Sequence, residues 1–131
     1  MDKPQILVVE DNPDNMKLVT WILEDAGYEM TGVTTGEECL ELMDVENPPE
    51  DQKFDLILMD ISLPGIDGKE TTQRIRKVEK YNDLPIIALT AHAIKGEGEA
   101  IRASGVTDLI IKPLQEEILL QRLDTALKSS S

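Results

Sequence analysis

The chain has 131 residues, of which 40% are hydrophobic, a size and composition that suit one domain with a single core. Its 26 acidic residues against 13 basic ones give a formal net charge of -13, which disfavours nucleic acid and anionic lipid as partners. The only cysteine, Cys39, has no partner for a disulfide, so we expect a small buried side chain in a reducing compartment.

No apolar run approaches the roughly 20 residues that a membrane-spanning helix needs. The N-terminus MDKPQ also lacks the basic and then apolar order of a secretion signal. We therefore expect a cytoplasmic protein without a membrane partner. We expect one domain over residues 1–131, with a core at about 5–128 and no effector domain after residue 131.

Short apolar runs predict strands that recur along the chain, the second of them weaker than the others. They cover residues 6–9, 30–33, 54–59, 85–89 and 109–111. Stripes at helical spacing lie between and after them: Met16, Val19, Leu23 and Ala26; Cys39, Leu40 and Met43; Ile75 and Val78; then Ile118, Leu119, Leu123 and Leu127 in a helix over 114–127. A less regular helix is expected at about 97–104, weakened at its start by Gly96 and Gly98.

This repeated alternation of strand and helix predicts an α/β fold with a parallel sheet. Parallel strands need crossover connections, and right-handed crossovers place helices on both faces of the sheet. The nearly continuous apolar strands agree with burial on both sides. The stretch 45–53 reads as a surface loop within the domain.

Each apolar run is followed or ended by a polar residue, and in such sheets ligands bind beyond the carboxyl ends of the strands. Three carboxylates gathered there would repel one another unless a cation compensates, and oxygen ligands suit Mg²⁺. An aspartate in this position can also act as a nucleophile toward a phosphoryl group, with a lysine and a threonine hydroxyl to contact the phosphoryl oxygens. The residues concerned are Glu10, Asp11, Asp60, Thr90 and Lys112.

Lys112 precedes Pro113, which biases the lysine toward extended backbone and predicts a prompt start of the last helix. Simpler interpretations remain open for each site residue. Glu10 and Asp11 are also consistent with solvated loop carboxylates ahead of a helix. Lys112 is also consistent with a structural salt bridge to such acids. Thr90 is also consistent with an ordinary cap of the next helix. Asp60 ends a fully apolar strand, so it needs a partner or a cation.

The segments VVEDN, LILMDISLPGIDG, PIIALTAHA and DLIIKPL, in this order and spacing, resemble the receiver domain of two-component response regulators. The resemblance covers nearly the whole chain. It implies a flavodoxin-like three-layer (βα)5 sandwich with a five-stranded parallel sheet in the order 2-1-3-4-5. It also implies phosphorylation of Asp60 by a phosphohistidine of a histidine kinase or histidine phosphotransfer protein, followed by contact with a downstream protein target.

The resemblance assigns roles to single residues. Asp11, Asp60 and the main-chain carbonyl of Ser62 would bind Mg²⁺ directly, and Glu10 would act through a water. Thr90 and Lys112 would contact the phosphoryl group. In receivers the positions of Ser62 and His92 flank the path of the attacking water, so both are candidate modulators of the phosphoryl lifetime; an exposed loop residue is the simpler interpretation of His92.

One position departs from the family pattern. Many receivers carry an aromatic residue three positions before the strand-end lysine, whereas Leu109 stands there in this chain. We therefore expect activation to act mainly through Thr90 and the loop 91–96. The resemblance also makes Asn15, Met16 and Leu18 candidates for docking of the phosphohistidine partner, while Trp21 is expected to be partly buried.

The segments EDNPDNMKLV and ALTAHAIKG resemble those of single-domain cell-cycle regulators and of the receivers of hybrid histidine kinases. A stand-alone protein and a receiver excised from a longer protein therefore both remain open. Either is expected to be a monomer or a weak phosphorylation-linked dimer. Neither would be an enzyme beyond self-catalysed phosphotransfer and autodephosphorylation. A haloacid dehalogenase-type phosphohydrolase would need a second Asp where Ser62 stands, and a flavodoxin would need a phosphate loop where Glu10 and Asp11 stand. A non-phosphorylated interaction module of the same fold is the nearest binding-only alternative.

Overall fold

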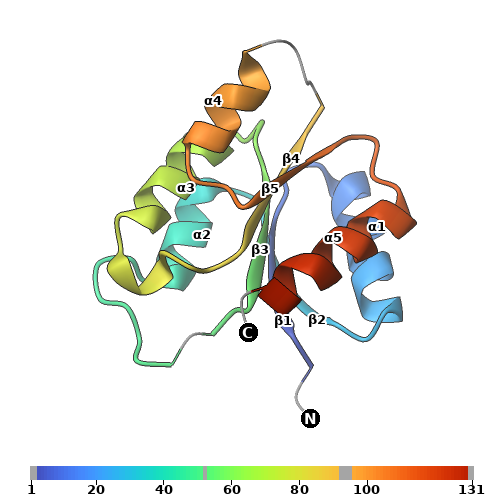
Figure 1. Cartoon of the computed structure of the whole chain (residues 1–131), viewed down its shortest axis with the longest axis horizontal. Helices are drawn as coiled ribbons and strands as arrows, with labels where there is room; N and C mark the ends of the chain where they lie inside the picture. The colour runs from blue at the N-terminus through green and yellow to red at the C-terminus, as the bar shows by residue number, and fades with distance from the viewer. Residues whose placement is uncertain (1–2, 52, 92–95, 130–131) are drawn as a thin grey trace.

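The computed structural model describes residues 3–51, 53–91 and 96–129. A five-stranded parallel sheet lies between two layers of helices (Figure 1), and its order, β2-β1-β3-β4-β5, confirms the predicted topology. The strands are β1 (Gln5–Val9), β2 (Glu29–Val33), β3 (Leu56–Asp60), β4 (Ile86–Thr90) and β5 (Asp108–Ile111). All of these strand pairs are parallel.

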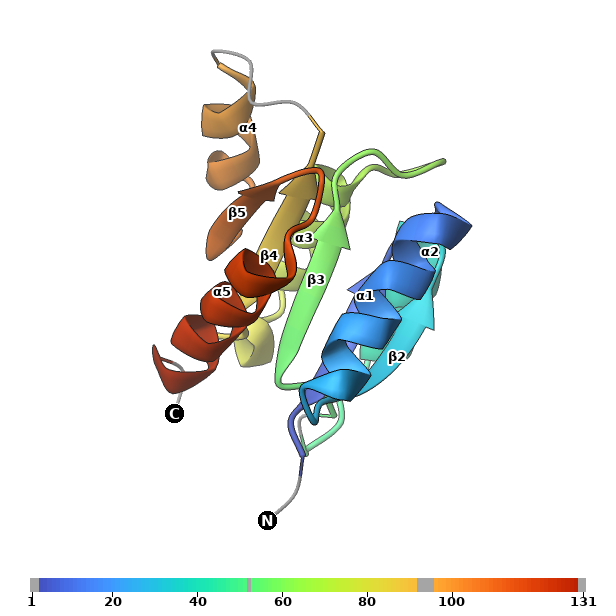
Figure 2. The same cartoon turned by 90° about the vertical axis from the view of Figure 1, so that its right-hand side faces the viewer.

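The helices divide between the two faces of the sheet. Helices α1 and α5 lie side by side on one face (Figure 2), and α2, α3 and α4 lie on the other. Their bounds are α1 (Pro13–Asp25), α2 (Gly36–Met43), α3 (Gly68–Arg76), α4 (Glu97–Ala103) and α5 (Glu116–Ser129), with a 3-10 turn η1 (Glu79–Tyr81) after α3.

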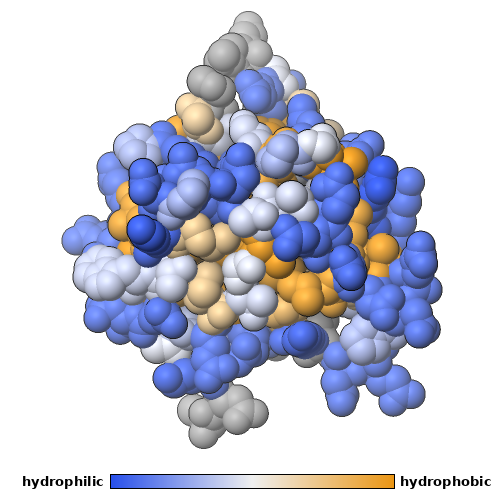
Figure 3. All heavy atoms as spheres, turned by 180° about the vertical axis from the view of Figure 1, so that it is seen from behind, coloured by the Kyte–Doolittle hydropathy of each residue, from blue (hydrophilic) through white to orange (hydrophobic). Residues whose placement is uncertain are grey.

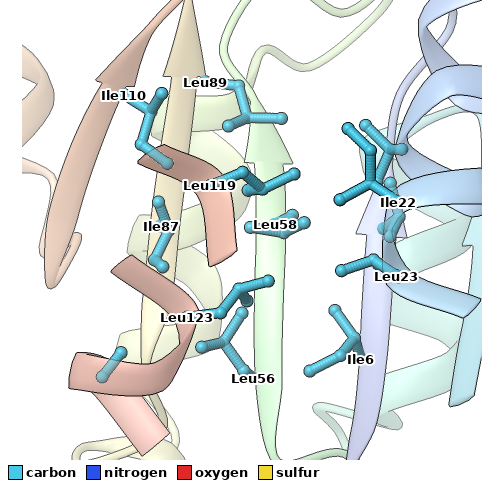
Figure 4. Close-up of a cluster of buried hydrophobic side chains, with 13 residues drawn as sticks. Ile6, Ile22, Leu23, Leu56, Leu58, Ile87, Leu89, Ile110, Leu119 and Leu123 are labelled. Carbon is cyan, nitrogen blue, oxygen red and sulfur yellow. The ribbon is translucent and has the colours of Figure 1, made fainter. Parts of the chain in front are cut away.

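The central strand β3 supplies side chains to two cores because successive residues of a strand point to opposite faces. Leu56 and Leu58 pack under α1 and α5, where Leu119 and Leu123 meet them (Figure 4). Ile57 and Met59 point to the other face and pack with residues of α2 and α3. All five residues of β3 are buried, so the strand is fixed rigidly up to its last residue, Asp60.

Cys39 lies fully buried in the core on the α2 and α3 face, as its sequence context predicts. Burial raises the pKa of its thiol to about 12, because a thiolate would lose its hydration there. The thiol therefore stays protonated and unreactive in the folded protein.

Three details of the predicted helices are wrong. The buried stripe of α1 contains Ile22, whereas Ala26 is exposed and lies just past the end of the helix. Helix α3 ends at Arg76, so Val78 lies in the following turn. Helix α5 begins at Glu116 rather than promptly after Pro113, and the backbone between them is irregular.

The surface combines hydrophilic side chains with scattered apolar areas, as the rear face in Figure 3 shows. Trp21 has 58% of its surface exposed, so this side chain is partly buried, as expected, but more than half of it faces solvent. Its position on α1 points it away from the stripe that packs on the sheet.

Within the described ranges, no helix is long and apolar enough to cross a bilayer.

Candidate functional site

The carboxyl ends of β1 and β3 bring two acidic residues together. The strands are paired neighbours, with Val9 opposite Met59, so the residue that follows β1 and the residue that ends β3 meet at the same edge. Glu10 is completely buried and Asp60 is 3% exposed, while Asp11 faces solvent. Carboxylate oxygens of these three residues all lie within 4.8 Å of one another, which confirms that the strand-end acids converge.

Lys112, which follows β5, places its ammonium group against this cluster. Its Nζ lies 3.0 Å from Glu10 Oε1 and 3.3 Å from Asp60 Oδ2. The backbone amide of Lys112 donates to the carbonyl of Thr90 over 2.7 Å, which fixes the start of the loop that carries the lysine. The side chain is only 17% exposed, so its positive charge is directed at the acids rather than at bulk solvent.

The two buried carboxyl groups titrate differently. Burial and the neighbouring Glu10 raise the pKa of Asp60 to about 7, despite the opposing effects of Lys112 and the Ser62 amide. Burial also acts to raise the pKa of Glu10, but hydrogen bonds with Asp60, the Asn12 amide and Lys112 outweigh it and leave that pKa below its usual value. Without a bound cation, Asp60 is therefore the more readily protonated of the two groups.

Two backbone amides orient the acids. The amide of Asn12 donates to Glu10 Oε2 and the amide of Ser62 donates to Asp60 Oδ1, each over 3.2 Å. The side chain of Asn12 also caps α1, because its Oδ1 accepts from the amides of Asp14 and Asn15. Sequence reasoning missed this residue, although an Asn directly before a Pro at a helix start is a recognised capping signal.

Thr90 and Ser62 lie close to Asp60 in the fold or the chain. Thr90 ends β4 with 2% of its surface exposed, and Ser62 is exposed two positions after Asp60. His92 lies outside the described residues. Leu109 is half-buried and packs against a small cluster made by Ile61, Ala88 and Ile101.

The loop between β3 and α3, residues 61–67, begins directly at Asp60 and returns to it. The amide of Gly68, the first residue of α3, donates to the Ile61 carbonyl over 3.0 Å. A Cβ atom on Gly68 would lie 2.3 Å from the carbonyl oxygen of Asp60, so only glycine permits this close return. The backbone around Asp60 is thus held by both the strand and the first turn of α3.

The donor set of this site suits a hard divalent cation. All three acidic side chains offer oxygen, and one of them is exposed, so an ion can reach the cluster from solvent. Two buried carboxyl groups facing one lysine also leave negative charge uncompensated once both are ionised. Oxygen-only ligands of this kind fit Mg²⁺ better than a soft metal.

Two curated relatives place this site in a signalling context. The sensor protein GacS of Pseudomonas syringae pv. syringae is 40% identical over 121 residues, which is 90% of this chain. The chain spans only 13% of the length of that sensor. The polar-differentiation response regulator DivK of Brucella ovis is 41% identical over 109 residues, with 83% of this chain and 84% of DivK covered.

A solved structure of the same fold holds a metal ion. The receiver domain of the sensor histidine kinase PA1611 from Pseudomonas aeruginosa PAO1 is 35% identical to this chain, with a TM-score of 0.85. The match covers 97% of this chain and 99% of that one. That structure has a magnesium ion coordinated in its active site cleft.

The family model for the response regulator receiver domain matches residues 6–124. This range contains the five strands, except Gln5 at the start of β1, and the converging residues at their ends. Members of this family are signalling domains of two-component systems that bind Mg²⁺ at an acidic site. The chain therefore belongs to the response regulator receiver domain family.

Proposed function

We propose that Asp60 is the phosphoacceptor of this receiver domain and that it takes a phosphoryl group from a phosphohistidine of a partner. The observation that carries this proposal is the convergence of Glu10, Asp11 and Asp60 within 4.8 Å, with the Lys112 ammonium 3.3 Å from Asp60. Asp60 ends a strand whose five residues are all buried, so its carboxylate is held in one place at the edge that faces incoming ligands.

Asp11, Asp60 and the main-chain carbonyl of Ser62 would hold Mg²⁺ directly, with Glu10 acting through a water. The exposed Asp11 and the buried Glu10 flank the acceptor, so ions can enter without opening the core. A bound Mg²⁺ would neutralise the carboxylates and the phosphoryl oxygens that must approach them. The acceptor reacts only when it is ionised, and the raised pKa of Asp60 favours its neutral form in the free site, so a cation beside it would favour the reactive carboxylate.

In the transfer step, an oxygen of Asp60 attacks phosphorus. A phosphorus–oxygen bond forms at Asp60 while the phosphorus–nitrogen bond of the partner's phosphohistidine breaks, and the imidazole keeps the electron pair. Lys112 already reaches Asp60 and can turn its ammonium group to a phosphoryl oxygen. The Thr90 hydroxyl, at the end of the next strand, would donate a hydrogen bond to another phosphoryl oxygen.

The domain would act as a switch rather than as an enzyme with its own substrate, since its chemistry is limited to phosphotransfer and autodephosphorylation at Asp60. Ser62 and His92 are the proposed modulators of the phosphoryl lifetime. Replacing His92 by Ala should change the dephosphorylation rate and leave Mg²⁺ affinity as it is. An unchanged rate would remove His92 from the mechanism.

The proposed partners are a histidine kinase or a histidine phosphotransfer protein, and a downstream protein target, in the cytoplasm. Leu18 is 41% exposed on α1, and Asn15 and Met16 are half-buried near the start of that helix, which makes this face available for docking. Nucleic acid and membranes would not be partners. Single-domain action and action within a longer hybrid kinase are both compatible with the relatives, as are a monomer and a weak phosphorylation-linked dimer.

Activation is proposed to act through Thr90 and the segment 91–96, because Leu109 offers no aromatic side chain to rotate. The contact of Leu109 with Ile61 and Ile101 supports a path from the residue after Asp60 to helix α4. Amide exchange across residues 91–104 should differ between the free protein and the beryllofluoride complex. Equal protection in the two states would refute this path.

The test of the proposed function is phosphotransfer from a panel of histidine kinases in the presence of Mg²⁺. Wild type should accept the phosphoryl group and Asp60→Asn should not. Asp55→Asn is the matched control, because Asp55 is an exposed acid just before the opposite end of the same strand, and it should accept normally. If wild type ignores every kinase and also small acyl-phosphate donors, the domain is a non-phosphorylated interaction module.

A further inference from the structure

We propose that Glu37, in the first turn of α2, is a positioning residue for the loop 61–67 and so for the metal and phosphoryl site. This inference rests on the proposed function, since it concerns how the acceptor Asp60 and Ser62 are held. Glu37 is exposed, lies outside the acidic cluster and contributes no atom to it.

The carboxylate of Glu37 packs directly on the backbone of the loop. A Cβ atom on Gly65 would lie 2.6 Å from Glu37 Oε2 and 3.3 Å from both Cδ and Oε1. The whole carboxylate therefore lies over Gly65, which adopts a φ of +73°. The amide of Ile66 points at the same Oε2 over 3.5 Å, a long hydrogen bond.

The start of α2 forms a rigid base for this contact. A Cβ atom on Gly36 would lie 2.1 Å from Thr71 Oγ1 and 2.9 Å from Cγ1 of Ile66, so α2, the loop and α3 meet with no space between them. Thr35 caps the helix by accepting from the amide of Glu38 over 3.0 Å. Glu37 thus reaches the loop from a fixed helix end.

The contact of Glu37 holds the middle of the loop 61–67. Its two ends are already fixed, because the amides of Leu63 and Gly68 both donate to the Ile61 carbonyl. The turn at Gly65 and Ile66 has its contact with α2 instead. Ser62 lies between these supports, and its amide orients Asp60 through a 3.2 Å hydrogen bond. Loosening the turn should therefore disturb both Ser62 and Asp60.

The first experiment measures Mg²⁺ affinity by calorimetry and amide exchange across residues 62–66. Glu37→Ala should weaken Mg²⁺ binding by about threefold to tenfold, less than for a buried outer-sphere partner because Glu37 is exposed. It should also speed exchange at residues 62–66. Glu37→Gln keeps an acceptor oxygen and should restore most of both properties. Glu41→Ala, one turn along the exposed side of α2, is the matched control and should change neither.

A double-mutant cycle tests the contact itself. Gly65→Ala places a methyl group against the Glu37 carboxylate and also strains the backbone at positive φ. The strain is present whatever stands at position 37, whereas the clash needs Glu37. Gly65→Ala should therefore weaken Mg²⁺ binding more in wild type than in the Glu37→Ala background.

Different results would overturn the role of Glu37 and the proposed function. Wild-type Mg²⁺ affinity and unchanged exchange in Glu37→Ala would overturn the role of Glu37, as would equal effects of Gly65→Ala in both backgrounds. A wild-type protein that fails to bind Mg²⁺ would overturn the proposed function. In that case, faster exchange at residues 62–66 in Glu37→Ala would still establish the loop contact, and unchanged exchange would refute it.

Discussion

The ammonium nitrogen of Lys112 lies 3.3 Å from Asp60 Oδ2, although the two residues follow and end strands that are separated by β4. The same nitrogen lies 3.0 Å from Glu10 Oε1. One lysine thus spans two buried acids across the carboxyl edge of the sheet. This arrangement leaves the lysine ready to contact a third anion bound at Asp60, and it makes the stability of the site depend on the charge of all three groups.

Replacing Lys112 by Met should destabilise the metal-free protein by about 2 kcal/mol at pH 8, because two buried acids lose their only nearby cation among the described residues. Urea unfolding at that pH measures the loss. Lys128→Met is the control, since Lys128 pairs with Asp124 at a site where both side chains are more than half exposed. That substitution should cost about 0.5 kcal/mol or less. Equal losses in the two variants would contradict the account.

Replacing Asp60 by Asn should stabilise the metal-free protein, and more so at pH 8 than at pH 5. The folded pKa of Asp60, about 7, lies above its ordinary value of 3.8, so the folded state binds this proton more tightly than the unfolded state. The resulting penalty is absent well below pH 4 and grows as the pH rises toward 7. We expect the gain from Asp60→Asn to be about 2 kcal/mol larger at pH 8 than at pH 5.

In wild type, the pH-dependent contribution of Glu10 falls mainly below the pH range of this comparison. The pKa of Glu10 is lowered, so its contribution to stability is present above its ordinary value of 4.5 and is lost only at lower pH. Urea unfolding of both proteins at pH 5 and pH 8, with a chelator present, measures the difference. A gain that is equal at the two pH values would show that Asp60 is not protonated near neutrality.

Adding Mg²⁺ should raise the melting temperature of wild type but not of Asp11→Asn. Ligand at 100 times its dissociation constant contributes about 2.7 kcal/mol to the folded state. Asp11 is exposed, so its replacement should leave the metal-free stability nearly unchanged. Asp14→Asn, an exposed acid on the first turn of α1, should respond to Mg²⁺ as wild type does. A Mg²⁺ shift that persists in Asp11→Asn would exclude Asp11 as a ligand.

The packing of helix α4 against the rest of the domain should depend on a single side chain. Ile101 is the only buried residue found in α4, and it packs with Ile61 and Ala88. Ile101→Ala should therefore speed amide exchange in α4 by about tenfold or more, with little change in α5. Ile118→Ala removes the same side chain from an exposed position of α5 and should leave α4 protected as in wild type. Unchanged exchange in the Ile101 variant would show that other contacts hold α4.

The strands and the site were predictable because the relevant information is local. Four of the strands are short apolar runs, with β2 the weaker exception, and Glu10, Asp60, Thr90 and Lys112 stand directly at the end of one. Once the sheet is parallel, those ends must share an edge. The packing of the acids around Lys112 follows from that topology without any knowledge of side-chain distances.

Contacts between residues distant in sequence were not predictable in this way. Arg76 binds the carbonyls of Gly105 and Tyr81 at 2.8 and 2.6 Å, yet its sequence context is that of an ordinary exposed helix residue. The contact of Glu37 with Gly65 is equally invisible until α2 and the loop are placed together. The late start of α5 escaped prediction because a proline favours extended backbone before it but does not fix where the next helix begins.

The central claim is that Asp60 accepts the phosphoryl group, and locating the phosphorylated residue tests it most directly. The protein would be treated with Mg²⁺ and an acyl-phosphate donor, reduced with borohydride to convert aspartyl phosphate to homoserine, digested and sequenced by mass spectrometry. We expect homoserine at position 60 and at no other aspartate. Homoserine at another position, or none at all under conditions that modify a known receiver domain, would contradict the account.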